Sequence, residues 1–155
     1  MIQWTCKSFD ELSKKELYSI LALRQETFVV EQYCPYLDVD GKDIQCFHLI
    51  GTNKSNDLLA YSRLIPKGLS YSEETSIGRI ISSGAARGSG YGRALMETSI
   101  QELKRLFGET SVRIGAQCYL KGFYEKFGFQ VASPIYLEDG IPHQEMIYIF
   151  EKKED

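Results

Sequence analysis

The stretch RGSGYG, residues 87–92, has the composition of an anion-binding loop. Three of its six residues are glycine, the residue that loses the most backbone freedom when a chain folds. The stretch follows an apolar run and precedes a helical pattern, so its backbone N–H groups would point outward at the positive end of a helix. Arg87 adds a cation at the same place. The stretch therefore predicts a pyrophosphate site, with a glycine turn that binds no ligand as the alternative.

Two common nucleotide-binding loops do not fit this stretch. A P-loop ends in Gly-Lys followed by Ser or Thr, and neither combination occurs in the chain. A dinucleotide-binding fingerprint counted from Gly88 would need a third glycine at the position of Arg93. The loop alone therefore does not identify its ligand.

Hydrophobic spacing and turn residues predict the elements that hold this loop. They give a strand, a helix, three strands, a helix, a strand, a helix and two last strands, which make a single mixed α/β domain over residues 1–155. Ser13 and Glu16 have the form of a capping box before the first helix, and Gly108 would close the second. The predicted strands are 2–6, 46–51, 58–65, 76–83, 111–117, 129–137 and 144–150, and the predicted helices are 13–28, 91–107 and 120–127.

Two of these segments carry more specific predictions. The strand–helix–strand unit at 76–117 should form a right-handed parallel crossover. Pro134 has no backbone N–H, so the strand that contains it should lie at a sheet edge or carry a bulge.

Composition narrows the class of protein. A net charge of −3 and a pI of about 5.5 do not favour nucleic acid or an anionic membrane as a partner. No apolar run approaches the roughly 20 residues that span a bilayer, and the first residues lack an export-signal pattern. The four cysteines lie far apart and are expected to be free thiols. We expect a cytoplasmic protein, monomeric or homodimeric, with no nucleic-acid or membrane partner.

Several stretches together resemble the GNAT superfamily of acyl-CoA-dependent N-acyltransferases. Arg87, Gly90 and Gly92 match its Arg-x-x-Gly-x-Gly pyrophosphate motif, and FYEKFGF lies where the superfamily places its second signature helix. The resemblance implies an α/β GNAT-type fold with a central mixed sheet of about seven strands flanked by helices. The stretches that further resemble the ElaA-like branch are 21–43 and 138–146, and the whole resemblance extends from about residue 15 to 147.

The resemblance also implies acetyl-CoA as the co-substrate. The strand at 80–82 would offer backbone groups to the pantetheine arm, and Gln117 stands where many members carry an asparagine near the cofactor. Ser82 and Gly84 occupy places where members often have a small apolar residue and a proline, a departure that a backbone contact tolerates. The implied CoA-binding residues are Ile80, Ile81, Ser82, Arg87, Gly88, Ser89, Gly90, Tyr91, Gly92, Arg93 and Gln117.

Tyr124 is the proton donor that the resemblance implies, because the tyrosine of the second signature helix often serves as general acid toward the CoA sulfur. The alternative is that Tyr124 only packs, since it shares its helix with Leu120, Phe123 and Phe127. A backbone N–H of the 80–82 strand is implied as the donor to the oxyanion.

The base that would take a proton from the attacking amine is left open. Glu31 is the first candidate, because it follows an apolar run where desolvation would raise its pKa; a solvated glutamate at a helix end is the alternative. His48 titrates in the right range but is equally compatible with a structural role. His143, predicted in a loop, and a chain of waters are the remaining options.

Arg24, Tyr33 and His48 are the candidates for contact with the acceptor. Arg24 shares a helix face with apolar residues, where its charge needs either an acidic partner in the chain, which we favour, or a carboxylate on the acceptor. If the acidic loop at 31–43 borders the acceptor cleft, it would favour a cationic amine such as a polyamine, an amino sugar or a lysine side chain.

No metal site is predicted. A loop that starts at Asp38 has Asp43 and Leu49 where an EF-hand needs glycine and glutamate. Cys46-x-His48 is too small a ligand set for zinc.

The combined prediction is an acetyl-CoA-dependent N-acetyltransferase that moves an acetyl group directly to a primary amine in a ternary complex. None of the cysteines has a base partner at motif spacing, so no acyl-enzyme is expected. A non-catalytic CoA-binding sensor or regulatory protein with the same fold is the alternative.

Overall fold

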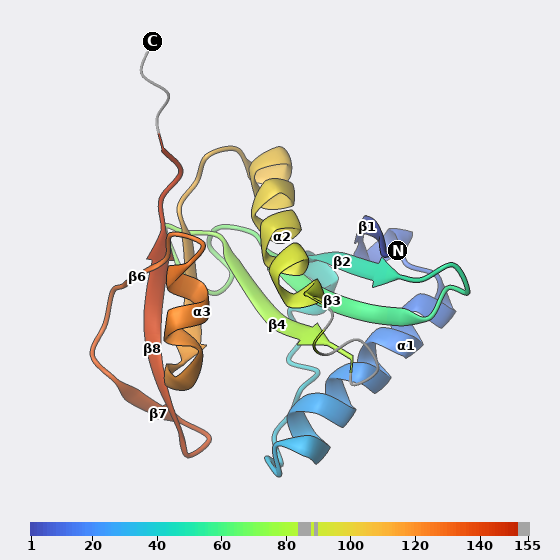
Figure 1. Ribbon diagram of the computed structural model, residues 1–155, viewed down its shortest axis with the longest axis horizontal. Coiled ribbons are helices and arrows are strands. Elements are labelled where there is room, and N and C mark those ends of the chain that lie inside the picture. Colours follow the sequence, from blue (N-terminus) through green and yellow to red (C-terminus); the bar gives the residue numbers. More distant parts are fainter. Residues whose placement is uncertain (84–87, 89, 152–155) are drawn as a thin grey trace.

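The structure, a computed structural model, describes residues 1–83, 88 and 90–151 of the chain. Two antiparallel sheets form its frame (Figure 1). The first has the strand order β1-β2-β3-β4, and the second has the order β5-β8-β6 with β7 paired to β8. The strands are β1 (Gln3–Ser8), β2 (Phe47–Thr52), β3 (Leu58–Ile65), β4 (Ser76–Ser82), β5 (Val112–Gln117), β6 (Gln130–Val131), β7 (Tyr136–Glu138) and β8 (Ile141–Tyr148).

The helices begin and end largely where local sequence predicts. The capping box is confirmed: Glu16 N–H donates to Ser13 Oγ at 3.0 Å, and Ser13 N–H donates to the Glu16 carboxylate at 2.8 Å. None of the helices in the described part of the chain is long and apolar enough to cross a membrane. The helices are α1 (Lys14–Arg24), α2 (Tyr91–Phe107), α3 (Lys121–Glu125), the π-helix η2 (Gln25–Glu31) and the 3₁₀ turns η1 (Phe9–Glu11), η3 (Asp43–Gln45) and η5 (Cys118–Leu120).

Helices α1 and α2 cover opposite faces of the first sheet. Ala60 of β3 packs with Leu95 of α2, whereas the next residue, Tyr61, packs with Ile20 of α1. Successive side chains of a strand point to opposite faces, so the two helices must lie on opposite sides of β3.

The main core lies between α2, α3 and the second sheet. Met96 of α2 and Tyr124 of α3 belong to the same buried cluster as Ile114 of β5 and Met146 of β8. Helix α2 therefore covers the same side of both sheets, and the opposite face of the second sheet lies on the side of α1 and η2.

The two sheets meet at one end and then separate. Within the described residues, one parallel bridge joins Thr75 to Val112, and Arg113 N–H donates to Thr75 O at 2.9 Å. Beyond this point β4 runs diagonally away from β8 (Figure 1). The predicted crossover is thus parallel only at its start. The predicted sheet of about seven strands is, in the described chain, two sheets with eight strands.

The C-terminal strands differ from the prediction in two places. The stretch 129–137 is not one strand, because it breaks around Pro134 into β6 and β7. His143, predicted in a loop, lies in β8 and pairs with Gln117 of β5. All four cysteines are free, as predicted.

Candidate active site

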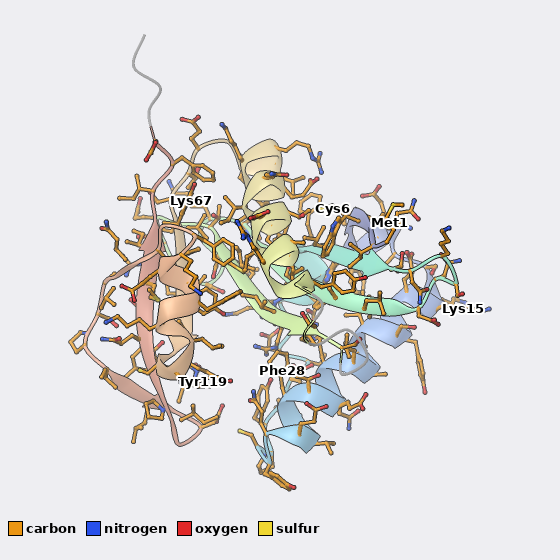
Figure 2. The ribbon with its side chains drawn as sticks, viewed as in Figure 1. Met1, Cys6, Lys15, Phe28, Lys67 and Tyr119 are labelled. Carbon is orange, nitrogen blue, oxygen red and sulfur yellow. The ribbon has the colours of Figure 1, made fainter. Side chains whose placement is uncertain are left out.

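The separation of β4 from β5 opens a cleft of about 950 Å³. Its walls come from β4 on one side and from β5, η5, α3, β7 and β8 on the other, and η2 with its following loop borders one end. Phe28 of η2 and Tyr119 of η5 both line the cleft and come from its two opposite sides (Figure 2).

Strand β4 presents an unpaired backbone edge to this cleft. One edge of β4 pairs with β3, and in the described chain no strand pairs with the other edge beyond the bridge at Thr75. Free N–H and C=O groups on a strand edge can bind an extended ligand that carries amides. Ile80, Ile81 and Ser82 line the cleft, as the sequence-based assignment requires.

A bulge interrupts β4 at its midpoint. Gly78 pairs with Arg63 and Ile81 with Tyr61, so β4 has one residue more than β3 between these pairs. Arg79 has a φ of +51°, in the left-handed region that costs a side-chain-bearing residue about 1–2 kcal/mol. In a regular strand the Arg79 side chain would face α2, but the bulge turns it toward the loop that follows η2.

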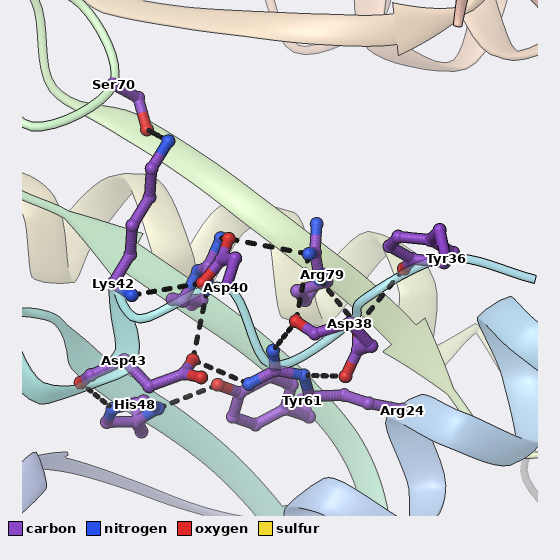
Figure 3. A network of polar contacts seen from close by, with 11 residues as sticks. Arg24, Tyr36, Asp38, Asp40, Lys42, Asp43, His48, Tyr61, Ser70 and Arg79 are labelled. Carbon is purple, nitrogen blue, oxygen red and sulfur yellow. Dashed lines mark hydrogen bonds and ion pairs between the residues drawn. The ribbon is translucent and has the colours of Figure 1, made fainter. Parts of the chain in front are cut away.

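A buried network of arginines and aspartates lies behind this bulge (Figure 3). One Asp38 oxygen accepts from Arg24 Nε at 2.9 Å, and the other accepts from Arg79 Nε at 2.8 Å. Asp38 therefore ties the end of α1 to the bulge. The six charged members of the network are Arg24, Arg63, Arg79, Asp38, Asp40 and Asp43.

Arg63 of β3 extends the network along the loop. It donates to both carboxylate oxygens of Asp40, at 2.8 and 2.9 Å, and to Asp43 at 3.1 Å. Burial disfavours the charged form of Asp40, but the hydrogen bonds and charge of Arg63 outweigh it and hold the pKa of Asp40 below its ordinary value. The aspartates of the predicted acidic loop are thus paired within the chain rather than offered to a cationic acceptor.

Arg24 and His48, two predicted acceptor contacts, belong to this network and not to the cleft. Arg24 is 0% exposed and donates to Asp38 and Asp43, so the favoured reading, an ion pair with the acidic loop, is confirmed and contact with an acceptor is wrong. His48 is also 0% exposed: its Nδ1 accepts from Tyr61 Oη at 2.7 Å and its Nε2 donates to Asp43 O at 2.9 Å. Burial lowers the pKa of His48, so its ring is a neutral structural group.

The two remaining candidates, Tyr33 for contact with the acceptor and Glu31 for the base, are both exposed. Tyr33 is 92% exposed and does not line the cleft, so it is not placed for acceptor contact. Glu31 lines the cleft at the end of η2 but is exposed, so the desolvation expected of a base at this position is absent. The described residues contain no group of three or more potential metal ligands.

Tyr124 lies in the wall of the cleft on the α3 side. It is 6% exposed, and burial raises its pKa to about 12, so its hydroxyl keeps its proton at neutral pH. Among the described residues its hydroxyl has no hydrogen-bond partner, although the ring packs against Phe123 and Phe129. The packing and donor interpretations of Tyr124 are therefore compatible.

The N-terminus of α2 has the backbone that an anion site needs. Gly90 caps the helix with a φ of +78°, and Gly88 has a φ of +83°; a side chain there would meet open space. The first N–H groups of a 17-residue helix have no intrahelical acceptor and attract anions. Tyr91 and Gly92 stand in its first turn. Arg87 and Ser89 lie outside the described residues.

A second hollow, of about 300 Å³, lies beside this helix end. Arg93, predicted to bind CoA, is there and pairs with Glu97 at 3.0 Å on the same helix. Its remaining lining residues are Phe123, Lys126 and Phe127.

The sequence interpretation missed a cluster on the face of the second sheet opposite α3 and Tyr124. The Tyr136 hydroxyl lies over Gly115. A Cβ added at Gly115 would come within 2.9 Å of the Tyr136 hydroxyl and within 3.7 Å of the Tyr71 hydroxyl. His143 stacks on Tyr136, with ring centroids 5.8 Å apart, and its Nε2 lies 3.2 Å from Glu138. The strand predicted from residue 144 begins at Ile141 in the structure, which brings His143 into β8.

Comparison with known proteins decides the family. A family model described as an acetyltransferase (GNAT) domain matches residues 45–150. The chain belongs to the GNAT acetyltransferase family. The match includes β2 to β8, the glycine loop, Tyr124 and His143 but not Arg24 or Asp38.

This GNAT protein is of the ElaA-like branch. The ElaA protein of Escherichia coli is 41% identical over 145 residues, which cover 92% of this chain and 94% of that protein. Its crystal structure has a TM-score of 0.88 at 39% identity, over 95% of this chain and 99% of that one. An acyl-CoA N-acyltransferase from Pseudomonas aeruginosa has a TM-score of 0.89 at 44% identity, over the same shares of the two chains.

A more distant structure shares the fold alone. An aminoglycoside 6′-N-acetyltransferase complexed with coenzyme A has a TM-score of 0.71 at 14% identity, covering 97% of this GNAT chain and 99% of that one.

Proposed function

We propose that this GNAT protein is an acetyl-CoA-dependent N-acetyltransferase that passes the acetyl group directly to a primary amine. One observation carries the proposal: the free edge of β4 and the unpartnered hydroxyl of Tyr124 line the same cleft. That arrangement suits a thioester held between a row of backbone donors and one side-chain donor.

Acetyl-CoA fits the groups that border this cleft. The N–H and C=O groups around Ile80 and Ser82 are free on the cleft side and match the amides of a pantetheine arm. The N-terminus of α2, with Gly88 and Gly90 in left-handed conformations, suits a pyrophosphate. Gln117, at the end of β5, lines the cleft and adds an amide that can donate or accept.

The chemistry needs donors for an oxyanion and for a departing sulfur. A backbone N–H of the β4 edge would stabilise the oxyanion, the role that usually contributes most to such reactions. Tyr124 would donate its proton toward the sulfur as the C–S bond breaks. A phenol with a pKa of about 12 is a weaker acid than a thiol, so this transfer must be coupled to loss of a proton from the attacking nitrogen.

The test is an acetylation screen with mass detection. Purified protein and acetyl-CoA are incubated with polyamines, aminoglycosides, amino acids and lysine peptides, and the mass of each product is measured by mass spectrometry. Mass detection avoids thiol-reactive dyes, which would also label the four free cysteines. A product heavier by one acetyl group supports the proposal and identifies the class of acceptor.

The opposite outcome favours the alternative function. If CoA binds, as measured by calorimetry, and no amine in a broad screen is acetylated, a CoA-binding sensor or regulatory protein is the better interpretation. If CoA does not bind, both functions are wrong.

A further inference from the structure

His143 lies in the cleft wall, on the face of the second sheet opposite α3 and Tyr124. In the β5–β8 pair, His143 is opposite Gln117, and Glu145 is opposite Gly115. These residues alternate with Ile114 and the other side chains that pack toward α3, so they face the other side of the sheet. Tyr124 and His143 therefore both line the cleft, from the two faces of this sheet.

The hydrogen bonds of His143 fix where it can take up a proton. Its Nδ1 lies 2.7 Å from the backbone carbonyl of Ile141, an acceptor, so Nδ1 carries the hydrogen and donates it. In the neutral ring, Nε2 then has the free lone pair. Glu138 Oε2 lies 3.2 Å from Nε2 and can accept a hydrogen bond only after Nε2 has gained a proton.

This arrangement has the parts of a base with an orienting partner. The His143 ring is 5% exposed, lines the cleft and stacks on Tyr136. The Glu138 carboxylate lies where it would stabilise the protonated ring. In nucleophile-activating histidines an acceptor on one ring nitrogen fixes the tautomer and leaves the other nitrogen as the base; here the Ile141 carbonyl fixes Nδ1–H, and Glu138 lies beside the basic Nε2.

We propose that His143, supported by Glu138, is the general base that removes a proton from the acceptor amine. The proposal rests on the proposed acetyltransferase function and names the group that the sequence left open. Glu31 lines the cleft but is exposed at the end of η2, and His48 is buried in the network away from the cleft. His143, in contrast, is buried and also lines the cleft.

The protons balance in the proposed step. An alkyl ammonium gives one proton to His143 Nε2, and the nitrogen lone pair then forms the C–N bond to the acetyl carbon. The C–S bond breaks and its electron pair leaves with sulfur. The second proton that nitrogen must lose ends on that sulfur, with the Tyr124 hydroxyl as the donor. The proton on His143 returns to solvent past Glu138, whose side chain is 60% exposed.

Other charged groups face this region and must be considered in any pH dependence. Glu138 and Tyr136 come from β7, Glu145 from β8 itself and Arg113 from β5, where it pairs with Glu145 at 2.9 Å. Tyr71 packs from the segment before β4, and burial followed by the charge of Glu145 raises its pKa to about 12. Burial also raises the pKa of the Tyr136 hydroxyl. Both tyrosines are therefore neutral at neutral pH, and Glu138 is the charge that faces Nε2 directly.

The first arm of the test needs no substrate. The chain has only two histidines, so long-range ¹H–¹⁵N NMR spectra assigned with a His143→Gln variant report the proton of each ring. We expect the neutral His143 ring to carry its hydrogen on Nδ1, which faces the Ile141 carbonyl, and the neutral His48 ring to carry its hydrogen on Nε2, which faces the Asp43 carbonyl. A neutral His143 ring protonated on Nε2 would overturn the proposal whether or not the protein acetylates anything.

The second arm uses an alkylamine that the wild-type protein acetylates. His143→Gln should lower kcat/KM by about 10²–10⁴-fold at neutral pH and leave CoA affinity unchanged. The rate that remains should follow the fraction of alkylamine that is already neutral, and so rise with pH. Added imidazole should restore part of the rate to His143→Ala, which a purely structural role would not allow. Glu138→Gln should produce a smaller loss.

The control in this arm is a weakly basic arylamine, which is already neutral and should be acetylated almost as well by His143→Gln as by wild type. Equal rates of wild type and His143→Gln on the alkylamine would overturn the assignment while leaving the acetyltransferase function in place. Absence of any acetylation by the wild type would instead count against the proposed function.

Discussion

At the scale of single residues, a hydroxyl's neighbours separate structural tyrosines from the candidate donor. Tyr61 and Tyr124 are both buried, and burial raises the pKa of each. Tyr61 donates its proton to His48 and is satisfied inside the network. Tyr124 has no partner among the described residues and lines the cleft. The Tyr124 hydroxyl is not one of the fully buried unpartnered atoms, so it is accessible from the cleft and available to a ligand, which supports a role for Tyr124 in binding or catalysis.

Tyr124→Phe tests this role. Because the hydroxyl makes no hydrogen bond to any residue in the described part of the chain, the thermal midpoint should change little and CoA affinity should stay within about twofold. Turnover should fall by about 10²-fold, the lower range for loss of a positioned proton donor. Steady-state kinetics and calorimetry provide the measurements. Tyr33→Phe, at an exposed position outside the cleft, is the matched control, and equal turnover of the two variants would exclude Tyr124 as the donor.

At the scale of elements, the bulge of β4 depends on a distant loop. Arg79 adopts an unfavourable backbone conformation, and the loop holds its side chain through Asp38, which also holds Arg24 at the end of α1. One aspartate therefore links a helix, a loop and the strand edge that we propose as the thioester site. Strain at a functional strand persists when its surroundings stabilise it, and here the network does so.

Asp38→Asn should weaken both the fold and the site. It removes a charge that two buried or half-buried guanidinium groups share, and breaking such a pair costs about 3–5 kcal/mol. For a chain of this size the thermal midpoint should drop by roughly 6–20 °C, and CoA affinity should fall as the bulge relaxes. Asp57→Asn is the control, because Asp57 is exposed. A midpoint that matches the control would show that the network is not needed for stability.

The two ends of α2 allow a second test at this scale. Gly90 and Gly108 flank the helix with φ values of +78° and +75°, and a Cβ at either would meet open space. Gly90→Ala and Gly108→Ala should therefore both destabilise the fold by about 1–2 kcal/mol. Only Gly90→Ala should weaken CoA binding, by roughly tenfold, because it changes the backbone at the proposed pyrophosphate site. Equal CoA affinities by calorimetry would contradict the assignment of this helix end.

At the scale of the whole molecule, buried ionisable groups set the pH range of stability. Burial raises the pKa of Tyr36, Tyr71 and Tyr124 to about 12, above the value of about 10 for an unfolded chain. Between these values the native state binds more protons than the unfolded state, so stability falls as pH rises. At acidic pH the sign reverses, because Arg63 and Arg24 hold the pKa values of Asp40 and Asp43 below those of the unfolded chain.

Thermal melts across the pH range should therefore show two limbs. The midpoint should be nearly constant between about pH 7 and 9 and should fall below about pH 6.5, because the unfolded chain protonates His48 while burial keeps it neutral in the native state. It should fall further below about pH 4 as the network aspartates take up protons, and fall again above about pH 10. Ultraviolet absorbance of phenolate should rise together with unfolding on the alkaline limb. A gradual rise of phenolate absorbance in the folded protein near pH 10, complete for all ten tyrosines, would show that these hydroxyls are not buried as described.

The sequence by itself determined the local elements and the family. The capping box at Ser13, the amphipathic pattern of α2 and the glycine at its end are encoded within a few neighbouring residues, and each has the predicted structure. The glycine loop and the FYEKFGF stretch indicated the GNAT family for the same reason, since each motif is continuous in the chain.

Only the tertiary structure decided which side chains share the cleft. Arg24 and His48 have the residue types of a binding site, but long-range pairing with the loop at 38–43 turned them into internal structure. His143 was already an open option for the base, but β8 pairs with β5 and β7 to place it in the cleft wall, through contacts that no local pattern encodes. The cleft itself exists because β4 and β5 pair at one end and then part, and the separation of two strands is a property of the whole fold.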